Sequence, residues 1–225
     1  ATITVWGLIG CLFLAGWFYT DLPDVEDSLA PSRRPTVWVL ANDGKEIAAV
    51  GDLYGIPVRL SDLPPALPQA VLATEDRRFY DHFGVDLIGL ARAMIANIRA
   101  GRIVQGGSTI TQQVAKNLFL TSERTYKRKI QEVMLALWLE NRFSKDQILE
   151  LYLNRVYLGA GTYGVDAAAR KYFNKPASGL NVWQSAMLAG LLKAPSRYNP
   201  LSDDDRAEKR TRVVLSNMVA AGYLT

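Results

Sequence analysis

The chain has 225 residues, 49% of them hydrophobic and 21% charged, which suits one sizeable domain with a buried core and excludes a disordered chain. The formal net charge is +4, and residues 97–145 alone hold nine Lys and Arg against three Glu. This positive region indicates an anionic partner, and nucleic acid, anionic lipid or a phosphorylated substrate would all fit. The single cysteine, Cys11, excludes an intrachain disulfide framework.

The N-terminal residues 1–20 contain no charged side chain, and twenty helical residues span about 30 Å, the thickness of a bilayer's hydrocarbon core. We therefore predict a transmembrane anchor there, with its helix over residues 3–19. The alternative is a cleaved signal peptide, but the aromatic cluster at residues 17–19 is more typical of a membrane interface. Residues 21–35, rich in Pro and charge, are predicted to form a linker.

A short β-hairpin with its connection is expected over residues 36–60, because Asn42-Asp43-Gly44 separates two β-prone runs. The remaining domain, residues 61–225, is predicted to be mainly helical. Capping patterns predict helix starts at Ser144 with Gln147, at Asn181 with Gln184, and at Asp203 to Asp205.

The stretch over residues 86–104 is a basic amphipathic pattern. After Asp86 its charges are all arginines, and apolar residues recur at helical spacing. The pattern predicts a helix lying in a membrane surface, and a core helix with solvated arginines is the alternative. The apolar positions are Leu87, Leu90, Ala91, Met94, Ile95 and Ile98, and the arginines are Arg92, Arg99 and Arg102.

A first candidate site lies in ATEDRRFYDHFG, residues 73–84. Glu75 and Asp76 are adjacent, so a helix points them about 100° apart and they form no carboxylate pair. A carboxylate near the aromatic residues here would be desolvated, which raises its pKa toward that of a general base. The competing interpretation is an exposed cluster of helix-end charges. His82, the only histidine, excludes a multi-histidine metal site.

Two further segments carry polar groups suited to an oxyanion. GGSTITQQVAKN, residues 106–117, predicts a helix start whose free N–H groups could bind phosphate, with Gln112 and Lys116 on one face. RTYKRKIQE, residues 124–132, places Arg128 and Glu132 four apart. A surface ion pair would explain that spacing, but with Lys116 the segment also supplies the cations that a diphosphate leaving group needs.

Two other classes of function compete with transfer from a phosphorylated donor. The apolar start and the lack of a recognition-helix pattern count against a nucleic-acid binder. A lysozyme-like hydrolase must protonate a sugar leaving group, whereas a diphosphate leaves without protonation when cations neutralise it. The basic cluster therefore favours transfer over hydrolysis.

Five segments, taken together and in order, resemble the family 51 glycosyltransferase domain of class A penicillin-binding proteins, closest to the 1A type, with monofunctional peptidoglycan glycosyltransferases second. The segments are ATEDRRFYDHFGVD, GGSTITQQVAKNLFL, RKIQE, KDQILELYLNRVYLGAGTYGVDAAARKYF and LAGLLKAPSRYNP. Asn174 replaces a common Gly, but Asn also tolerates a left-handed backbone.

This resemblance implies a mainly α, lysozyme-like fold with a small membrane-associated jaw lobe. It implies an enzyme that polymerises lipid II into β-1,4-linked glycan strands with inversion and release of undecaprenyl diphosphate. The expected partners are lipid II, the growing strand, membrane lipids and cell-wall synthesis proteins. The location implied is the bacterial cytoplasmic (inner) membrane, crossed once, with the catalytic domain on the periplasmic face.

Residue by residue, the resemblance makes Glu75 the catalytic base and Glu132 a second catalytic carboxylate that organises the diphosphate site directly or through a divalent cation, Mg or Mn. Lys116 and Arg128 would hold the diphosphate. The other expected substrate-binding residues are His82, Ser108, Thr109, Gln112, Asn117, Lys129 and Lys193.

The sequence contains no Ser-x-x-Lys and no Lys-Thr-Gly, so these residues include no transpeptidase site. We expect a fragment of a class A protein. The alternative function is a membrane-anchored scaffold that binds glycan or lipid II without turnover.

Overall fold

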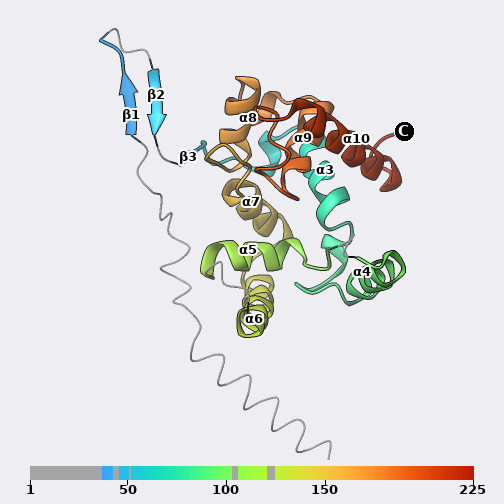
Figure 1. The fold of residues 1–225 in the computed structure, drawn as a ribbon. Helices are drawn as coiled ribbons and strands as arrows, with labels where there is room; N and C mark the ends of the chain where they lie inside the picture. Colours follow the sequence, from blue (N-terminus) through green and yellow to red (C-terminus); the bar gives the residue numbers. More distant parts are fainter. Residues whose placement is uncertain (1–36, 43–45, 51, 103–105, 121–124) are drawn as a thin grey trace, which may run out of the picture.

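The computed structural model describes residues 37–42, 46–50, 52–102, 106–120 and 125–225, and most of them are helical (Figure 1). The predicted mainly α fold is therefore confirmed. Single 3-10 turns occur at Leu60–Asp62, Phe79–Asp81 and Ala177–Gly179. The helices are α3 (Ala66–Glu75), α4 (Leu87–Ala100), α5 (Ile110–Phe119), α6 (Tyr126–Arg142), α7 (Lys145–Arg155), α8 (Val165–Phe173), α9 (Val182–Leu191) and α10 (Asp204–Ala220).

The predicted hairpin is present as two antiparallel strands, β1 (Val37–Leu40) and β2 (Glu46–Val50). Val37 pairs with Val50, and the register shifts at Leu40, which pairs with Glu46. Asp43 and Gly44 of the expected turn lie outside the described residues. A second pairing, which the sequence did not indicate, joins β3 (Leu53–Tyr54) in parallel to β4 (Thr162–Tyr163).

The predicted anchor and linker, residues 1–35, also lie outside the described residues. Within the part of the chain that the structure describes, no helix is both long and apolar enough to cross a membrane.

Capping residues fix the helix boundaries, as the sequence predicted. Ser144 and Gln147 form a reciprocal capping box at the start of α7, and Asn181 and Gln184 form another at the start of α9. Asp203 caps α10. Asn174 ends α8 in a left-handed conformation, with φ 53°, so the turn survives without glycine.

The short connection before α3 is held against the helical body by three polar side chains. Asp166 accepts from Ile56 N at 3.1 Å, and Glu150 accepts from Leu60 N at 2.9 Å. Asn154 both accepts from Val58 N and donates to Val58 O, each at 2.8 Å. These contacts fix the route by which the chain enters the domain.

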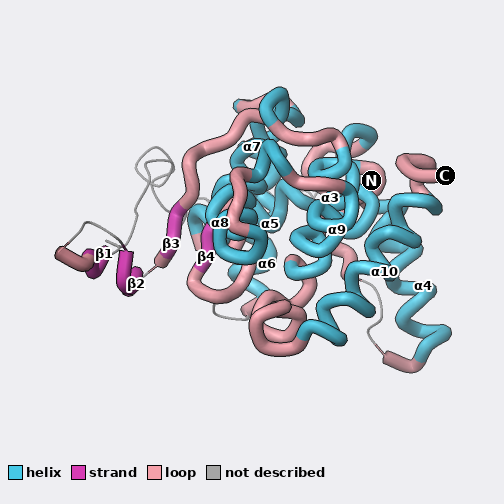
Figure 2. Tube along the Cα trace, turned by 90° about the horizontal axis from the view of Figure 1, so that it is seen from above, coloured by secondary structure: helices cyan, strands magenta, loops and turns pink. Residues whose placement is uncertain are grey.

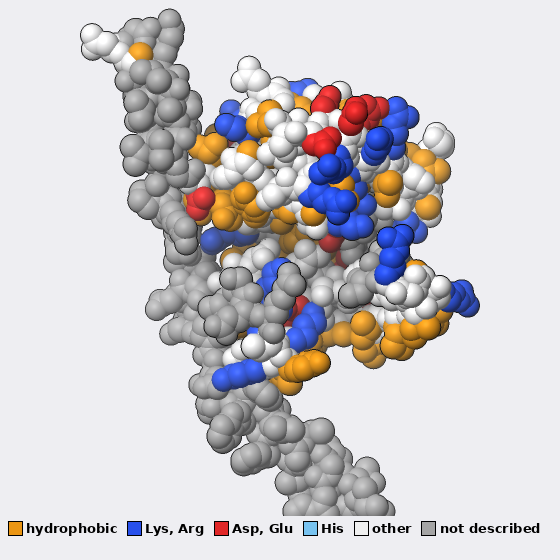
Figure 3. Space-filling model, viewed as in Figure 1, with side chains coloured by type: hydrophobic (Ala, Val, Ile, Leu, Met, Phe, Trp, Pro, Cys, Tyr) orange, Lys and Arg blue, Asp and Glu red, His pale blue; other side chains and the backbone are white. Residues whose placement is uncertain are grey.

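Helix α4 differs from the rest of the body because it buries only Ala93. The residues predicted to form its apolar face are exposed, including Leu87 at 72% and Ile98 at 73%. Figure 3 shows apolar side chains gathered along one edge of this helix. In Figures 1 and 2, α4 lies at the opposite side of the domain from β1 and β2. The alternative of a core helix is therefore wrong.

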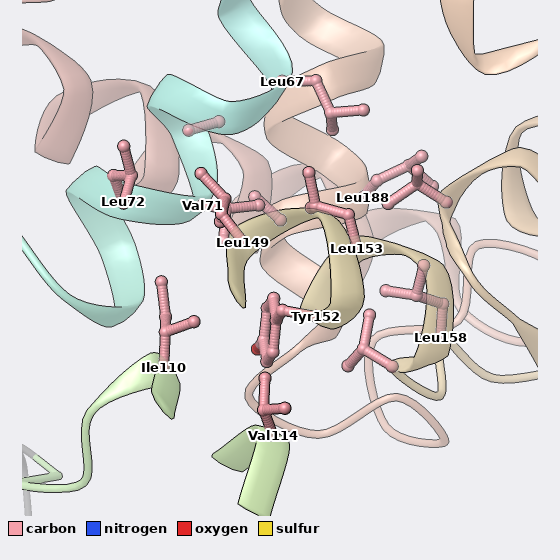
Figure 4. Close-up of a cluster of buried hydrophobic side chains, with 14 of the residues drawn as sticks. Leu67, Val71, Leu72, Ile110, Val114, Leu149, Tyr152, Leu153, Leu158 and Leu188 are labelled. Carbon is pink, nitrogen blue, oxygen red and sulfur yellow. The ribbon is translucent and has the colours of Figure 1, made fainter. Parts of the chain in front are cut away.

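The core brings α3, α5, α7 and α9 together, and α10 packs on α3 and α9 (Figure 4). Leu67 of α3, Ile110 of α5 and Leu149 of α7 are each fully buried. A Leu or Ile buried to this extent contributes about 1.5–3 kcal/mol relative to exposure. The core therefore holds the C-terminal end of α3 rigidly beside the start of α5.

Candidate active site

A cleft of about 1060 Å³ opens beside the C-terminal end of α3. Its walls come from α3, α4, α5, α6 and α10 and from the segment after α9, and its lining includes the carboxylate of Glu75 and several cations. Figure 3 shows Lys and Arg side chains on both sides of this hollow. The cations of its lining are Arg77, Arg92, Lys116, Arg128, Lys129, Lys193 and Arg210.

Glu75 is the last residue of α3, and its side chain is half-buried. Gln113 Nε2 donates to Glu75 Oε2 at 3.0 Å. Burial raises the pKa of the Glu75 carboxyl above its ordinary value of 4.5, while the hydrogen bond from Gln113 and then the charge of Arg210 oppose that rise. The predicted direction of the shift is confirmed, and the competing exposed cluster is wrong for Glu75.

The aromatic residues that the sequence offered as the cause of desolvation do not all contribute. Tyr80 and Phe83 are 54% and 57% exposed, and the Tyr80 hydroxyl donates to Asp146. The polar groups that act on Glu75 come from helices distant in sequence: Gln113 donates a hydrogen bond to it, and the charge of Arg210 lowers its pKa.

Asp76 and Glu75 have different partners, as predicted, but α3 ends at Glu75 and Asp76 follows it with a non-helical backbone, φ −159°. Its carboxylate is buried and accepts from Ile110 N at 3.0 Å and from His82 Nε2 at 3.0 Å. Asp76 therefore occupies the start of α5, where a negative charge favours the helix dipole. Thr109 caps the same helix by accepting from Gln112 N. The expectation of a phosphate at free N–H groups of this helix start is wrong for Ile110, because a protein carboxylate already binds there.

The first turns of α6 form the cationic wall around Glu132, which is 3% exposed. Arg128 Nη1 donates to Glu132 Oε2 at 3.1 Å, and Lys129 Nζ donates to Glu132 Oε1. Lys129 also donates to Ser108 Oγ at 3.0 Å and to Gln112 Oε1 at 3.2 Å. The Arg128–Glu132 pair is thus a partly buried network rather than a surface ion pair, and it fixes the positions of two cations.

The predicted site residues divide into two groups. Glu75, Ser108, Thr109, Lys116, Arg128, Lys129, Glu132 and Lys193 line the cleft. His82, Gln112 and Asn117 do not: His82 packs under Asp76, Gln112 is buried beneath Lys129, and Asn117 is exposed outside the lining. The role of each predicted residue stays a prediction.

Sequence reasoning missed Gln113 and Arg210. Helical spacing placed Gln112 on one face with Lys116, and the family resemblance made Gln112 substrate-binding, but Gln113 is the residue that lines the cleft. Arg210 lies in a helix whose pattern indicated only structure, and no local signal connects it to Glu75.

The predicted divalent cation at Glu132 does not fit the surrounding groups. Both carboxylate oxygens already accept from cations, Arg128 and Lys129. Among the described residues, no group of three or more His, Cys, Asp or Glu side chains gathers in a metal-binding arrangement. Mg and Mn favour several oxygen ligands. A requirement for Mg or Mn stays a prediction, checked by polymerisation after chelation and after each ion is restored.

The domain is mainly helical, and a carboxylate with a raised pKa faces a cleft lined by cations. Similarity to known protein families identifies the class to which such a domain belongs. The sequence profile of the family described as Transglycosylase matches residues 43–219. The chain belongs to that family.

Its relatives include penicillin-binding protein 1A of Neisseria flavescens, 45% identical over 97% of this chain and 27% of the relative. Penicillin-binding protein 1A of Escherichia coli K12 is 48% identical over 91% of this chain and 24% of the relative. The crystal structure of penicillin-binding protein 1A from Haemophilus influenzae superposes with a TM-score of 0.50 and 29% identity, covering 86% of this chain and 19% of that chain. The chain thus spans about a quarter of the length of the curated relatives it matches.

Proposed function

We propose that this chain is a peptidoglycan glycosyltransferase that polymerises lipid II into β-1,4-linked glycan strands. The observation that carries the proposal is Glu75, a half-buried carboxylate with a raised pKa in a cleft lined with cations. Membership of the Transglycosylase family and similarity to penicillin-binding protein 1A support the same activity. A scaffold that only binds lipid II would need the cations but not a carboxylate tuned toward a base.

In this mechanism Glu75 accepts the proton of the acceptor's 4-hydroxyl as that oxygen attacks the anomeric carbon of the donor. The new glycosidic C–O bond forms with inversion while the bond to the diphosphate breaks. Undecaprenyl diphosphate leaves with the bonding electrons.

The leaving diphosphate is held by Lys116, Arg128 and Lys129. Lys116 is exposed at the cleft wall, and Glu132 fixes the other two cations by direct ion pairs. Charge-assisted contacts of this kind neutralise the developing negative charge, so the leaving group needs no proton donor.

The family-level features of the fold belong to the same proposal. We assign α4 to a jaw lobe of a lysozyme-like fold that rests in the outer face of the bacterial cytoplasmic membrane, with residues 1–20 as a single-pass anchor. The exposed apolar face of α4 and its arginines support this placement. Lipid II would then enter the cleft directly from the membrane, and other cell-wall synthesis proteins are expected as partners.

Nitroxide accessibility tests the membrane placement in the full chain reconstituted in vesicles. With Cys11→Ser as background, labels are placed at Ile98→Cys on α4 and at Val219→Cys, an exposed apolar position on α10. We expect oxygen, which partitions into lipid, to relax the label at position 98, and a water-soluble nickel chelate to relax the label at 219. Equal accessibility of both labels to the nickel chelate would show that α4 does not lie in the membrane.

The activity is tested with labelled lipid II and the detergent-solubilised chain, with products separated by length. Wild type should give long glycan. Glu75→Gln should lose at least about 100-fold in rate because the base is removed while the side-chain shape is kept. Glu150→Gln is the matched control, a half-buried carboxylate that binds Leu60 N outside the cleft, and should polymerise like wild type. A folded Glu75→Gln protein with near-normal rate would refute the assignment.

A further inference from the structure

A chain of two hydrogen bonds connects the core to Glu75. Tyr152 of α7 donates its hydroxyl to Gln113 Oε1 at 3.1 Å, and Gln113 Nε2 donates to Glu75 Oε2 at 3.0 Å. Tyr152 is 1% exposed, and Figure 4 shows its ring between α7 and Val114 of α5. Packing of the ring therefore fixes the hydroxyl in the core, from where it reaches Gln113 at the cleft wall.

The chemistry of the two ends fixes the orientation of the amide between them. An ionised carboxylate only accepts hydrogen bonds, so Gln113 must present its NH₂ group to Glu75. Burial, and then the charge of Glu75, raise the pKa of the Tyr152 phenol well above 10, so the hydroxyl keeps its proton and donates. Gln113 Oε1 accepts this hydrogen bond, whereas a flipped amide would set its oxygen against the Glu75 carboxylate, with two acceptors facing each other and no donor between them.

We propose that Tyr152 is a positioning residue for Glu75: its hydroxyl locks the Gln113 amide with its donor toward the carboxylate. This inference rests on the proposed function, because it assigns a structural support to the proposed base. This pair of hydrogen bonds, called the lock below, keeps one oxygen of Glu75 occupied and leaves the other for an acceptor hydroxyl. It also limits the rise in pKa that burial causes, so that the carboxylate is ionised when the acceptor arrives.

Other groups also act on Glu75 and must be held constant in a test. Arg210 of α10 and Lys193 after α9 lower its pKa, and Asp76, the next residue in the chain, raises it. The Tyr152 hydroxyl donates to Gln113 rather than to any of these three groups, so replacing Tyr152 by Phe removes one hydrogen bond and leaves those charges in place. The ring volume is conserved, which limits repacking.

The test is the titration of Glu75 followed by carbon NMR of the labelled carboxyl, in the full chain. Tyr152→Phe leaves Gln113 Oε1 without its donor, so the hydrogen bond from the Gln113 amide to Glu75 weakens. The titration midpoint of Glu75 should then rise by about one pH unit. Tyr172→Phe is the matched control, because Tyr172 donates to Leu158 O at 2.9 Å outside the cleft. It should leave the midpoint unchanged. An unchanged midpoint in Tyr152→Phe overturns the proposal.

A double-mutant comparison establishes that Tyr152 acts through Gln113. Gln113→Leu alone should raise the Glu75 midpoint, and adding Tyr152→Phe to it should cause no further rise. An additive rise would show that Tyr152 acts on Glu75 independently, and would overturn the positioning role.

Polymerisation supplies a second readout that separates this proposal from the proposed function. In Tyr152→Phe the acid limb of the rate profile should move to higher pH by the same amount as the NMR midpoint, with an unchanged KM for lipid II. A shifted midpoint in a chain whose wild type forms no glycan would support the lock while refuting the glycosyltransferase. Normal polymerisation with an unchanged acid limb in Tyr152→Phe would refute the lock and leave the enzyme assignment intact.

Discussion

Glu75 and Glu132 face the same cleft but lie in opposite environments. Glu75 receives one neutral hydrogen bond, from Gln113, and burial raises its pKa. Glu132 is more deeply buried and both of its oxygens accept from cations, Arg128 and Lys129. One carboxylate is therefore prepared to take a proton, and the other holds two positive side chains in place.

The contrast shows that a residue type acquires its role from its surroundings. Neighbouring helices supply those surroundings: α5 and α10 contribute the groups around Glu75, whereas Glu132 is paired with residues of its own helix. A change at either carboxylate should consequently have its own signature in turnover, binding and stability.

The largest expected effect separates chemistry from binding. Glu75→Gln should lower the polymerisation rate by at least about 100-fold, and the concentration of lipid II that half-saturates binding should stay within about twofold of wild type. Equilibrium binding and initial rates measured on the same preparation check this split. Parallel losses in both quantities would contradict a role confined to proton transfer.

Glu132→Gln should weaken donor binding by about tenfold, because Arg128 and Lys129 lose the carboxylate that positions them. The free energy of unfolding should also fall by about 1 kcal/mol, since two half-buried donors lose their charged acceptor. Glu208→Gln, which removes an exposed carboxylate paired with Arg212, is the control and should change neither quantity. Unaltered donor binding in Glu132→Gln would contradict the role of Glu132 in positioning these cations.

A smaller effect is expected at Lys116, which lines the cleft but is not one of the two cations that Glu132 holds. Lys116→Ala should raise KM for lipid II several-fold, up to about tenfold, by removing one charge-assisted contact. Lys209→Ala removes an equally exposed cation of α10 outside the cleft and should leave KM unchanged. Identical KM values in the two variants would exclude Lys116 from the diphosphate site.

The smallest expected effect is on stability and pH. The folded pKa of Glu75 is raised above 4.5, so the unfolded chain loses this proton at lower pH than the folded chain does, and folding becomes less favourable as pH rises. Glu75→Gln lacks that titration. Relative to wild type, it should gain stability between pH 4.5 and the folded pKa and keep that gain above it, as measured by denaturant unfolding across pH. A gain that grows as pH falls would have the wrong sign.

The sequence predicted what depends on local pattern. Hairpin strands, capping boxes and the exposed face of α4 each arise from residues close together in the chain, and each is confirmed. The environment of Glu75 depends on tertiary contacts instead. Gln113 is 38 residues away from Glu75, so no periodicity within α3 could indicate it.

The start of α5 shows the same limit. The sequence predicted a capped helix start correctly, but the group that binds Ile110 N is Asp76, 34 residues earlier, rather than a phosphate. Local spacing also could not single out Gln113, because Tyr152 and Glu75, the residues that hold its amide, both lie outside the segment.

A single-turnover experiment tests the central claim most directly, namely that Glu75 supplies chemistry and Glu132 supplies binding. Glu75→Gln and Glu132→Gln are each mixed with a trace of labelled lipid II and unlabelled acceptor, and bound lipid and glycan are counted in the same sample. The account predicts bound lipid without glycan for Glu75→Gln, and reduced bound lipid with residual glycan for Glu132→Gln. Glycan at the wild-type rate from Glu75→Gln, or full binding by Glu132→Gln, would contradict it.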